Sequence, residues 1–242
     1  MNDEAIPAAT LILVRDRAGA APEILMVERA ERMAFAAGAL VFPGGRIDAA
    51  DTDFAASIGT DGAIIAAIRE TLEETAIPAA LTPTPQPAAA LELQRQLLAG
   101  ASLRDLGLTF DPAVLQPFAR WVPKFHAVRR FDTMFYVAAC PPGDWQPNVV
   151  EGECARAEWV TAAEVLDREQ RGEARLIFPT RRTLERLAQH SSIAAIRADA
   201  AAHPIEPISP WVEDHGGKNF IAIPDHLGFP VTREPLDGLW RG

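Results

Sequence analysis

Alternating apolar and polar stretches predict a chain of short strands interrupted by helices. The expected strands are short runs, rich in β-branched and aromatic residues and bounded by turn-forming residues. They lie at 10–14, 24–27, 39–42, 118–122, 131–139 and 158–160. Residues 46–61 are polar and lack a clear period, so we expect them to be irregular.

The clearest helix is predicted over 62–75, where Asp61 is a suitable N-cap and Pro78 follows the end. Further helices are expected at 89–99, at 102–107, from a Thr161 cap to about 170, and from a Thr180 cap to about 189. A Pro- and Ala-rich connector covers 78–90, and Gly216 and Gly217 mark a β-hairpin near the C-terminus. Mixed strands and helices of this kind indicate a single α/β or α+β domain with a C-terminal extension.

Composition narrows the function classes. Hydrophobic residues make up 48% and charged residues 23%, as in ordinary globular proteins. The net charge of −10 argues against a binder of nucleic-acid polymers or anionic membranes. Two cysteines, Cys140 and Cys154, without a CxxC pair, do not suggest a disulfide scaffold or a structural zinc site. With no signal-peptide pattern and no apolar run near 20 residues, we expect a cytoplasmic protein that is independent of membranes.

The expected helix 62–75 separates apolar from acidic side chains. Spacings of three and four residues place Glu70, Glu73 and Glu74 on one face, away from the isoleucines and Leu72. A Phe-Pro-Gly-Gly turn at 42–45 precedes them, and Arg69 adjoins the first glutamate. Such an acidic face is either simply solvated or a source of hard oxygen ligands for Mg²⁺ or Mn²⁺; the glycine turn favours the second interpretation.

The stretch GGRIDAAD…RETLEETAI resembles the Nudix box, G-x5-E-x7-R-E-U-x-E-E-x-G-U, where U is aliphatic. Its second half matches from Arg69 to Ile77. Three departures stand out: Asp51 replaces the first glutamate, Ala76 replaces the last glycine, and 23 residues separate Gly45 from Arg69 where the pattern has 13. The additional ten residues are expected to loop out before the helix.

This resemblance implies the Nudix α/β/α sandwich with a mixed sheet, and a metal-dependent pyrophosphohydrolase that cleaves a diphosphate linkage. The implied metal ligands are Glu70, Glu73, Glu74 and the backbone of Gly45. Arg69 would brace the carboxylates, and the general base would be Glu70 or Glu153, with Glu151 as a substitute for the latter.

The resemblance also sets the expected domain organisation. Residues 1–200 would form the Nudix hydrolase domain, with the box at 45–77 and a helical insertion at about 78–116. Residues 201–242 would form an extension whose hairpin packs on the same domain. Because many Nudix proteins are dimers, the resemblance allows a homodimer.

The small-molecule substrate is expected from a further resemblance, to the longer Nudix branch that includes acyl-coenzyme A diphosphatases. The segment from Arg29 to Gly38 keeps the frame of a coenzyme A motif, but Ala34 occupies the position of its second arginine. The candidate phosphate contacts are Arg29, Arg32, Arg129 and Arg130. The alternatives are hydrolysis of ADP-ribose, dinucleotides or other nucleoside diphosphate derivatives, and a Nudix-like domain that binds nucleotides without turnover.

Overall fold

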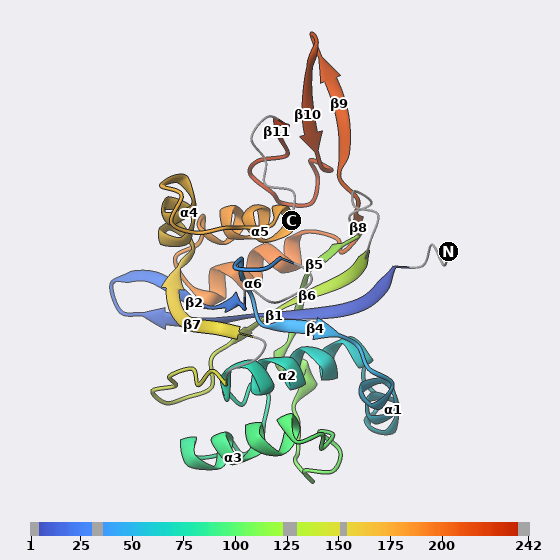
Figure 1. The fold of residues 1–242 in the computed structure, drawn as a ribbon, viewed down its shortest axis with the longest axis vertical. Coiled ribbons are helices and arrows are strands. Elements are labelled where there is room, and N and C mark those ends of the chain that lie inside the picture. The colour runs from blue at the N-terminus through green and yellow to red at the C-terminus, as the bar shows by residue number, and fades with distance from the viewer. Residues whose placement is uncertain (1–4, 31–35, 123–129, 151–153, 237–242) are drawn as a thin grey trace.

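The computed structural model describes residues 5–30, 36–122, 130–150 and 154–236 (Figure 1). The strands are β1 (Ile6–Arg17), β2 (Ala20–Arg29), β3 (Leu40–Val41), β4 (Gly44–Arg46), β5 (Gln116–Trp121), β6 (Phe131–Ala139), β7 (Cys154–Thr161), β8 (Pro207–Ile208), β9 (Trp211–His215), β10 (Lys218–Ala222) and β11 (Arg233–Pro235). The helices are α1 (Ala49–Ile58), α2 (Gly62–Thr75), α3 (Pro87–Leu98), a 3₁₀ turn at Pro112–Val114, α4 (Ala162–Gln170), α5 (Phe178–Leu187) and α6 (Ile193–Ala202).

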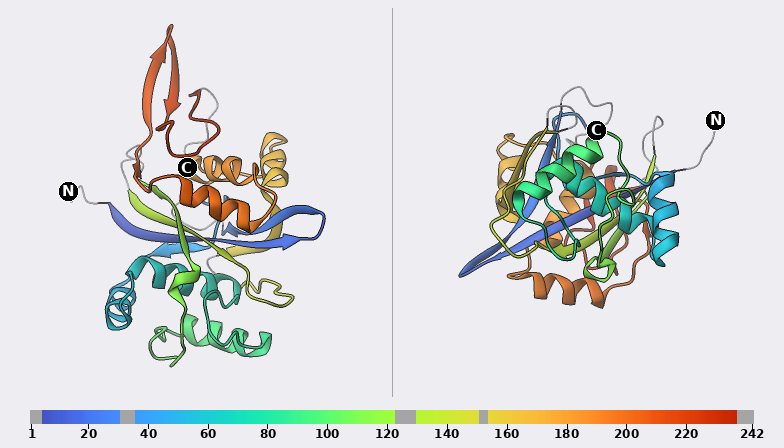
Figure 2. Two further views of the ribbon diagram at one scale, coloured as in Figure 1. Left: turned by 180° about the vertical axis from the view of Figure 1, so that it is seen from behind. Right: turned by 90° about the horizontal axis from the view of Figure 1, so that it is seen from below.

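A mixed sheet forms the centre of the molecule, with strand order β3-β2-β1-β6-β5-β8. Two further strands join it: β4 pairs with β1, and β7 pairs with β2. The β1–β6 and β5–β8 pairs are parallel, whereas β1 pairs with β2 and β4 in antiparallel fashion. Helices α1, α2 and α3 lie on one side of the sheet, and α4, α5 and α6 lie on the other (Figures 1 and 2). The expected sandwich of helices around a mixed sheet is therefore confirmed.

Strand β1 supplies both hydrophobic cores because successive side chains of a strand point to opposite faces. Leu11 and Leu13 pack in the cluster beneath α2, while Ile12 and Val14 pack in the cluster beneath α5 and α6. All four side chains are fully buried. Such a strand is an apolar run rather than an alternating one, which explains why its sequence is apolar at every position from Leu11 to Val14.

Helix α2 has the predicted bounds and the predicted cap. The Asp61 side chain accepts a hydrogen bond from the backbone N–H of Ala63 at 2.8 Å, which satisfies one of the free donors at the helix start. Ile65, Ile68 and Leu72 are fully buried against the sheet. The apolar face of α2 therefore fixes the position of the helix, and with it the position of the acidic face.

The expectation of an irregular segment at 46–61 is wrong. Most of it is α1, a ten-residue helix. Asp48 and Asp51 form its capping box, and Gly59 ends it in the left-handed conformation at φ 71°. Phe54 anchors the helix through an edge contact with Phe110, their ring centroids 5.7 Å apart. The ten extra residues of the box thus form packed structure instead of a loop.

Three other expectations about helices require correction. Residues 102–107 form turns rather than a helix. Helix α5 begins at Phe178 with Pro179 in its first turn, so Thr180 lies inside the helix and is not its cap. Helix α6 was not expected, although Ser192 caps it by accepting a hydrogen bond from the N–H of Ala195. Among the described residues, every helix is too short or too polar to cross a lipid bilayer.

The predicted hairpin around Gly216 and Gly217 is present as β9 and β10, and β11 extends it to three strands. This small sheet stands away from the central sheet (Figures 1 and 2). Glu234 of β11 ties it to α5 through ion pairs with Arg181 at 3.2 Å and Arg182 at 2.6 Å. Beside them, burial raises the pKa of Glu185 to about 7 despite its contact with Arg182.

Helix α2 ends at Ala76, the residue that replaces the last box glycine. Ala76 adopts the left-handed conformation at φ 58°, and its N–H donates to the Leu72 carbonyl at 2.9 Å. A Cβ in this conformation costs about 1–2 kcal/mol, part of which a glycine returns as entropy of the unfolded chain. We expect Ala76→Gly to stabilise the fold by about 0.5–1 kcal/mol and to raise Tm by about 1–4 °C in thermal unfolding.

Ala99, which ends α3, provides the matched control. Its φ is −82°, so a glycine there removes no strain and adds only chain entropy. Ala99→Gly should leave Tm unchanged or slightly lower. An equal response at both positions would contradict the assignment of strain to Ala76.

Candidate active site

The turn Gly44–Gly45 brings the backbone of the box against the acidic face of α2. The N–H of Gly44 donates to Glu74 Oε2 at 3.0 Å. Gly45 lies under the Glu70 carboxylate, so that a Cβ at Gly45 would be 2.3 Å from Glu70 Oε1. A Cβ at Gly44 would meet the Ala9 carbonyl at 2.4 Å. Close approach to the backbone of β1 therefore requires glycine at position 44, whereas at position 45 a Cβ would only displace the Glu70 side chain. Two of the three predicted carboxylates meet at this turn.

Arg69 connects the carboxylates into one buried cluster. Its Nη1 donates to Glu70 Oε1 at 2.9 Å and to Glu73 Oε2 at 3.0 Å. Its Nε and Nη2 each donate to the Asp51 carboxylate at 2.9 Å, a bidentate pair. Burial lowers the pKa of the Arg69 guanidinium, but its bond to Asp51 and the charges of Glu70, Asp51 and Glu73 raise that pKa above the usual range.

Asp51 serves two structures at once. It is the partner of Arg69, and its Oδ2 also accepts the N–H of Asp48 at 2.9 Å in the capping box of α1. The Asp51 side chain is only 3% exposed. Aspartate at the first acidic position of the box is therefore held in place by the additional helix, in whose first turn it lies.

An amide network closes the other end of α2. Gln94 of α3 donates from Nε2 to the Glu73 carbonyl at 2.8 Å and to the Asn148 carbonyl at 2.9 Å. Asn148 Nδ2 donates back to Gln94 Oε1 at 2.7 Å, and the Asn148 N–H donates to the Thr75 carbonyl at 2.8 Å. The last turn of α2 is thus bonded to α3 and to the loop that follows β6.

The donor set suits a divalent cation in its chemistry. Glu70, Glu73 and Glu74 offer carboxylate oxygens, the ligands preferred by Mg²⁺ and Mn²⁺, beside a turn that leaves room for close approach. Within the described part of the chain, however, no three acidic, histidine or cysteine side chains converge as a ready metal site. Glu70 and Glu73 accept hydrogen bonds from Arg69, and Glu74 accepts one from Gly44, so in this structure the three carboxylates are oriented by protein donors.

Two of the four candidate arginines lie at the box end of the sheet. Arg29 ends β2 and exchanges backbone hydrogen bonds with the segment Gly38–Ala39. The carbonyl of Arg130 accepts from the N–H of Ile6 at the start of β1. Because β4 pairs with residues 8–10 of β1, these backbones lie at the same end of the sheet as Gly44 and Gly45. Arg32, Arg129, Glu151 and Glu153 lie outside the described residues.

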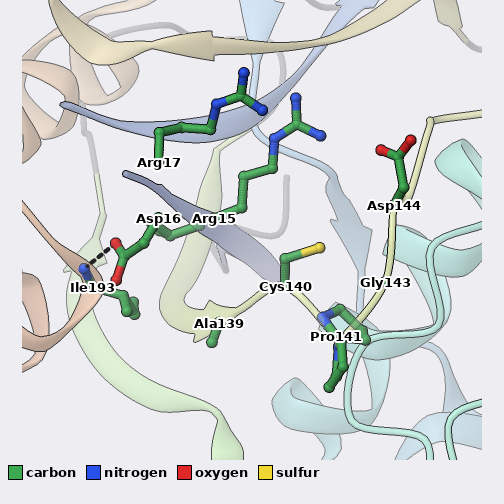
Figure 3. A pocket seen from close by; sticks show the side chains of 11 residues that line it. Arg15, Asp16, Arg17, Ala139, Cys140, Pro141, Gly143, Asp144 and Ile193 are labelled. Atoms are coloured by element: carbon green, nitrogen blue, oxygen red, sulfur yellow. Dashed lines mark hydrogen bonds between the residues drawn. The ribbon is translucent and has the colours of Figure 1, made fainter. Parts of the chain in front are cut away.

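A surface hollow of about 480 Å³ lies at the opposite end of β1 (Figure 3). Arg15 on its wall is paired with Glu23 at 2.5 Å and covers the Trp159 ring. Burial raises the pKa of the Cys140 thiol to about 11. The cysteine is therefore a protonated thiol at neutral pH, and the hollow is separate from the acidic cluster.

Sequence patterns identified the acidic cluster but missed the residues that support it. The helical spacing identified Glu70, Glu73 and Glu74, and the box pattern identified Asp51 and Arg69. Gln94 and Asn148 gave no signal, because each is separated along the chain from the groups that it bonds. The bond from Gly44 to Glu74 also depends on tertiary contact.

Comparisons with known proteins bear on the fold. No protein-family model matches the chain, and no curated protein matches it. Among solved structures, a NUDIX hydrolase from Alicyclobacillus acidocaldarius is 28% identical, with a TM-score of 0.68 over 86% of this chain and 100% of that one. Other solved structures match less closely, and two of those with TM-scores below 0.5 illustrate this.

The first of these is the NUDIX domain of Shewanella oneidensis NrtR complexed with ADP ribose, at 14% identity and TM-score 0.47 over 77% of this chain and 88% of that one. The second is the MutT protein from Methanosarcina mazei Go1, at 16% and 0.43 over 78% and 96%. The fold is thus the Nudix fold, as its similarity to the Alicyclobacillus structure shows. Together, the fold and the box residues make this chain similar to the Nudix hydrolases.

Proposed function

We propose that this protein is a divalent-metal-dependent hydrolase of diphosphate linkages, with coenzyme A or acyl-coenzyme A as its substrate class. The observation that carries the proposal is the meeting of Glu70 and Glu74 at the Gly44–Gly45 turn, with Arg69 bonded to Glu70 and Glu73. A purely structural acidic face would not need a glycine turn packed against β1 with two carboxylates meeting at it.

In this proposal Glu70, Glu73 and Glu74 hold the cation, together with the backbone of Gly45. The bound ion would offset charge on the bridging phosphates and lower the pKa of a water molecule. Arg69 keeps the carboxylates oriented while sharing its charge with Asp51. Its five N–H donors suit this task, since they bind several acceptors in fixed directions.

Hydrolysis adds one water across the P–O–P linkage. The water oxygen bonds to one phosphorus, the bond from that phosphorus to the bridging oxygen breaks, and the products are two phosphate monoesters. A glutamate takes the proton from the water and returns it to solvent or product. Glu70 and Glu153 are the candidate bases that the resemblance to the Nudix box implies.

The coenzyme A assignment depends on the segment that begins at Arg29. Arg29 and Arg130 lie at the end of the sheet that holds the box glycines. A diphosphate and a neighbouring phosphate bound there would need cationic partners. Arg32 and Arg129 are further candidates by sequence. The substitution of arginine by Ala34 is the feature that favours the second candidate, hydrolysis of ADP-ribose or a dinucleotide.

The test is a substrate panel with purified protein and Mg²⁺ or Mn²⁺. We expect coenzyme A and an acyl-coenzyme A to be cleaved at the diphosphate linkage into a phosphopantetheine product and adenosine 3′,5′-bisphosphate, and EDTA to abolish the reaction. Chromatography of the products would identify the bond that breaks. Turnover of ADP-ribose or a dinucleotide without turnover of coenzyme A would overturn the substrate class. Binding without turnover of any diphosphate would indicate a non-catalytic domain.

A further inference from the structure

The strongest unassigned feature is the network of Gln94 and Asn148 at the end of α2. Gln94 lies in the middle of the buried stripe of α3, between Ala90 and Leu97. It is 1% exposed, like Ala90, whereas an apolar side chain would fill that position at no cost in hydrogen bonding. A buried amide at this position therefore requires partners, and it has them.

The partners of the network are groups that a helix leaves unsatisfied. The last four carbonyls of a helix accept no hydrogen bond from within the helix. In α2 this set includes the carbonyls of Glu73 and Thr75. Gln94 bonds to the first at 2.8 Å, and the N–H of Asn148 bonds to the second at 2.8 Å. The reciprocal bond from Asn148 to Gln94 at 2.7 Å closes the network.

The bonded backbone belongs to the acidic cluster itself. Glu73 provides both the carbonyl held by Gln94 and a carboxylate held by Arg69. Glu74 is the next residue, and its side chain accepts the Gly44 N–H. A shift of this turn would therefore move two carboxylates together relative to the glycine turn.

We propose that Gln94 and Asn148 are positioning residues that fix the last turn of α2 and thereby orient Glu73 and Glu74 for metal binding. The inference rests on the metal role of these glutamates in the proposed function. Neighbouring groups that orient metal ligands typically change metal affinity or activity by about 10–100-fold when they are removed. A residue that contributed only to packing would change stability without changing metal affinity in the folded protein.

The test replaces Gln94 with methionine, which has a similar length and no N–H donors. We expect Mn²⁺ affinity, measured by electron paramagnetic resonance or calorimetry at 25 °C, to weaken by about 10-fold. We also expect kcat to fall by about 10-fold or more, with KM for the diphosphate nearly unchanged. Thermal unfolding would verify that the variant is folded at the assay temperature.

Gln96→Met is the matched control, since Gln96 lies on the exposed side of the same helix and its amide donates to Glu92. Its Mn²⁺ affinity and kcat should equal those of the wild type. Asn148→Ala is a second variant: Asn148 is an exposed loop residue, and the variant removes the Nδ2 donor while it keeps the backbone bond to Thr75. It should weaken Mn²⁺ binding in the same direction as Gln94→Met.

Wild-type Mn²⁺ affinity in a folded Gln94→Met, or in Asn148→Ala if the first variant does not fold, would overturn the inference. The metal measurement keeps this result distinct from failure of the proposed function. A wild-type protein that binds Mn²⁺ through Glu73 and Glu74 but cleaves no diphosphate would refute the proposed reaction only, and the variants would still test the positioning role.

Discussion

Glu74→Gln is expected to lower the metal-dependent kcat by about 1,000-fold. A carboxylate ligand lost from a divalent site removes several kcal/mol of charge stabilisation, and each 1.36 kcal/mol is a factor of ten in rate. The fold should be retained, because the amide oxygen of glutamine can still accept the Gly44 N–H that now bonds Glu74 at 3.0 Å. The measurement is initial rate of diphosphate cleavage at saturating Mg²⁺, accompanied by Mn²⁺ affinity.

Glu92→Gln is the control for this substitution. Glu92 lies on α3 in a surface pair with Arg95, away from the glycine turn, so its replacement should leave the rate unchanged. Activity of Glu74→Gln within tenfold of the wild type would remove Glu74 from the metal site.

Arg69→Met should have the largest effect on stability. The Arg69 side chain is 11% exposed, and its loss leaves the Asp51 carboxylate without its bidentate partner. Breaking a buried ion pair from one side typically costs about 3–5 kcal/mol, which corresponds to a fall in Tm of about 10 °C for a chain of this size. Denaturant or thermal unfolding measures the change, in the absence of added metal.

Arg120→Met provides the comparison. Arg120 also makes a bidentate pair, with Asp132, but 41% of its side chain is exposed. Exposed pairs contribute about 0–1 kcal/mol, so this variant should unfold near the wild-type temperature. Equal losses of stability in the two variants would show that burial does not make the Arg69 ion pairs more stabilising than the exposed Arg120 pair.

The sequence predicted the elements whose local signals agree with their tertiary environment. Helix α2 was predicted at its observed bounds because Asp61 caps it and its apolar residues follow the helical period. Strand β6 was predicted over its full length for a similar reason, since its sequence is rich in β-branched and aromatic residues. In both cases neighbouring residues alone determine the element.

Elements that depend on distant partners were predicted poorly. Strand β1 runs from Ile6 to Arg17, well beyond the apolar run at 10–14, because pairing with β6 and β4 extends it at its first residues. The sequence does not predict helix α1, because its apolar residues, mostly alanines, do not gather on one face. Local patterns contain no information about these pairings.

The same division applies to the candidate site. The spacing of the three glutamates predicts that they share one face of the helix, and the position of Arg69 next to Glu70 predicts that it belongs to the same group. The contact of Glu73 with Gln94 joins residues 21 positions apart on different helices, so no spacing rule predicts it.

The sharing of Asp51 between α1 and Arg69 has a consequence for how this region can diverge. Both contacts are made in the first turn of α1, so the rest of that helix and the connection to α2 lie outside the clasp. Insertions or deletions at residues 59–61, between the two helices, change the length of a connection outside the packed part of α1, and the entropy of a closed loop changes only slowly with its length. Segment length at this position can therefore drift between related proteins while the geometry of the carboxylates is preserved.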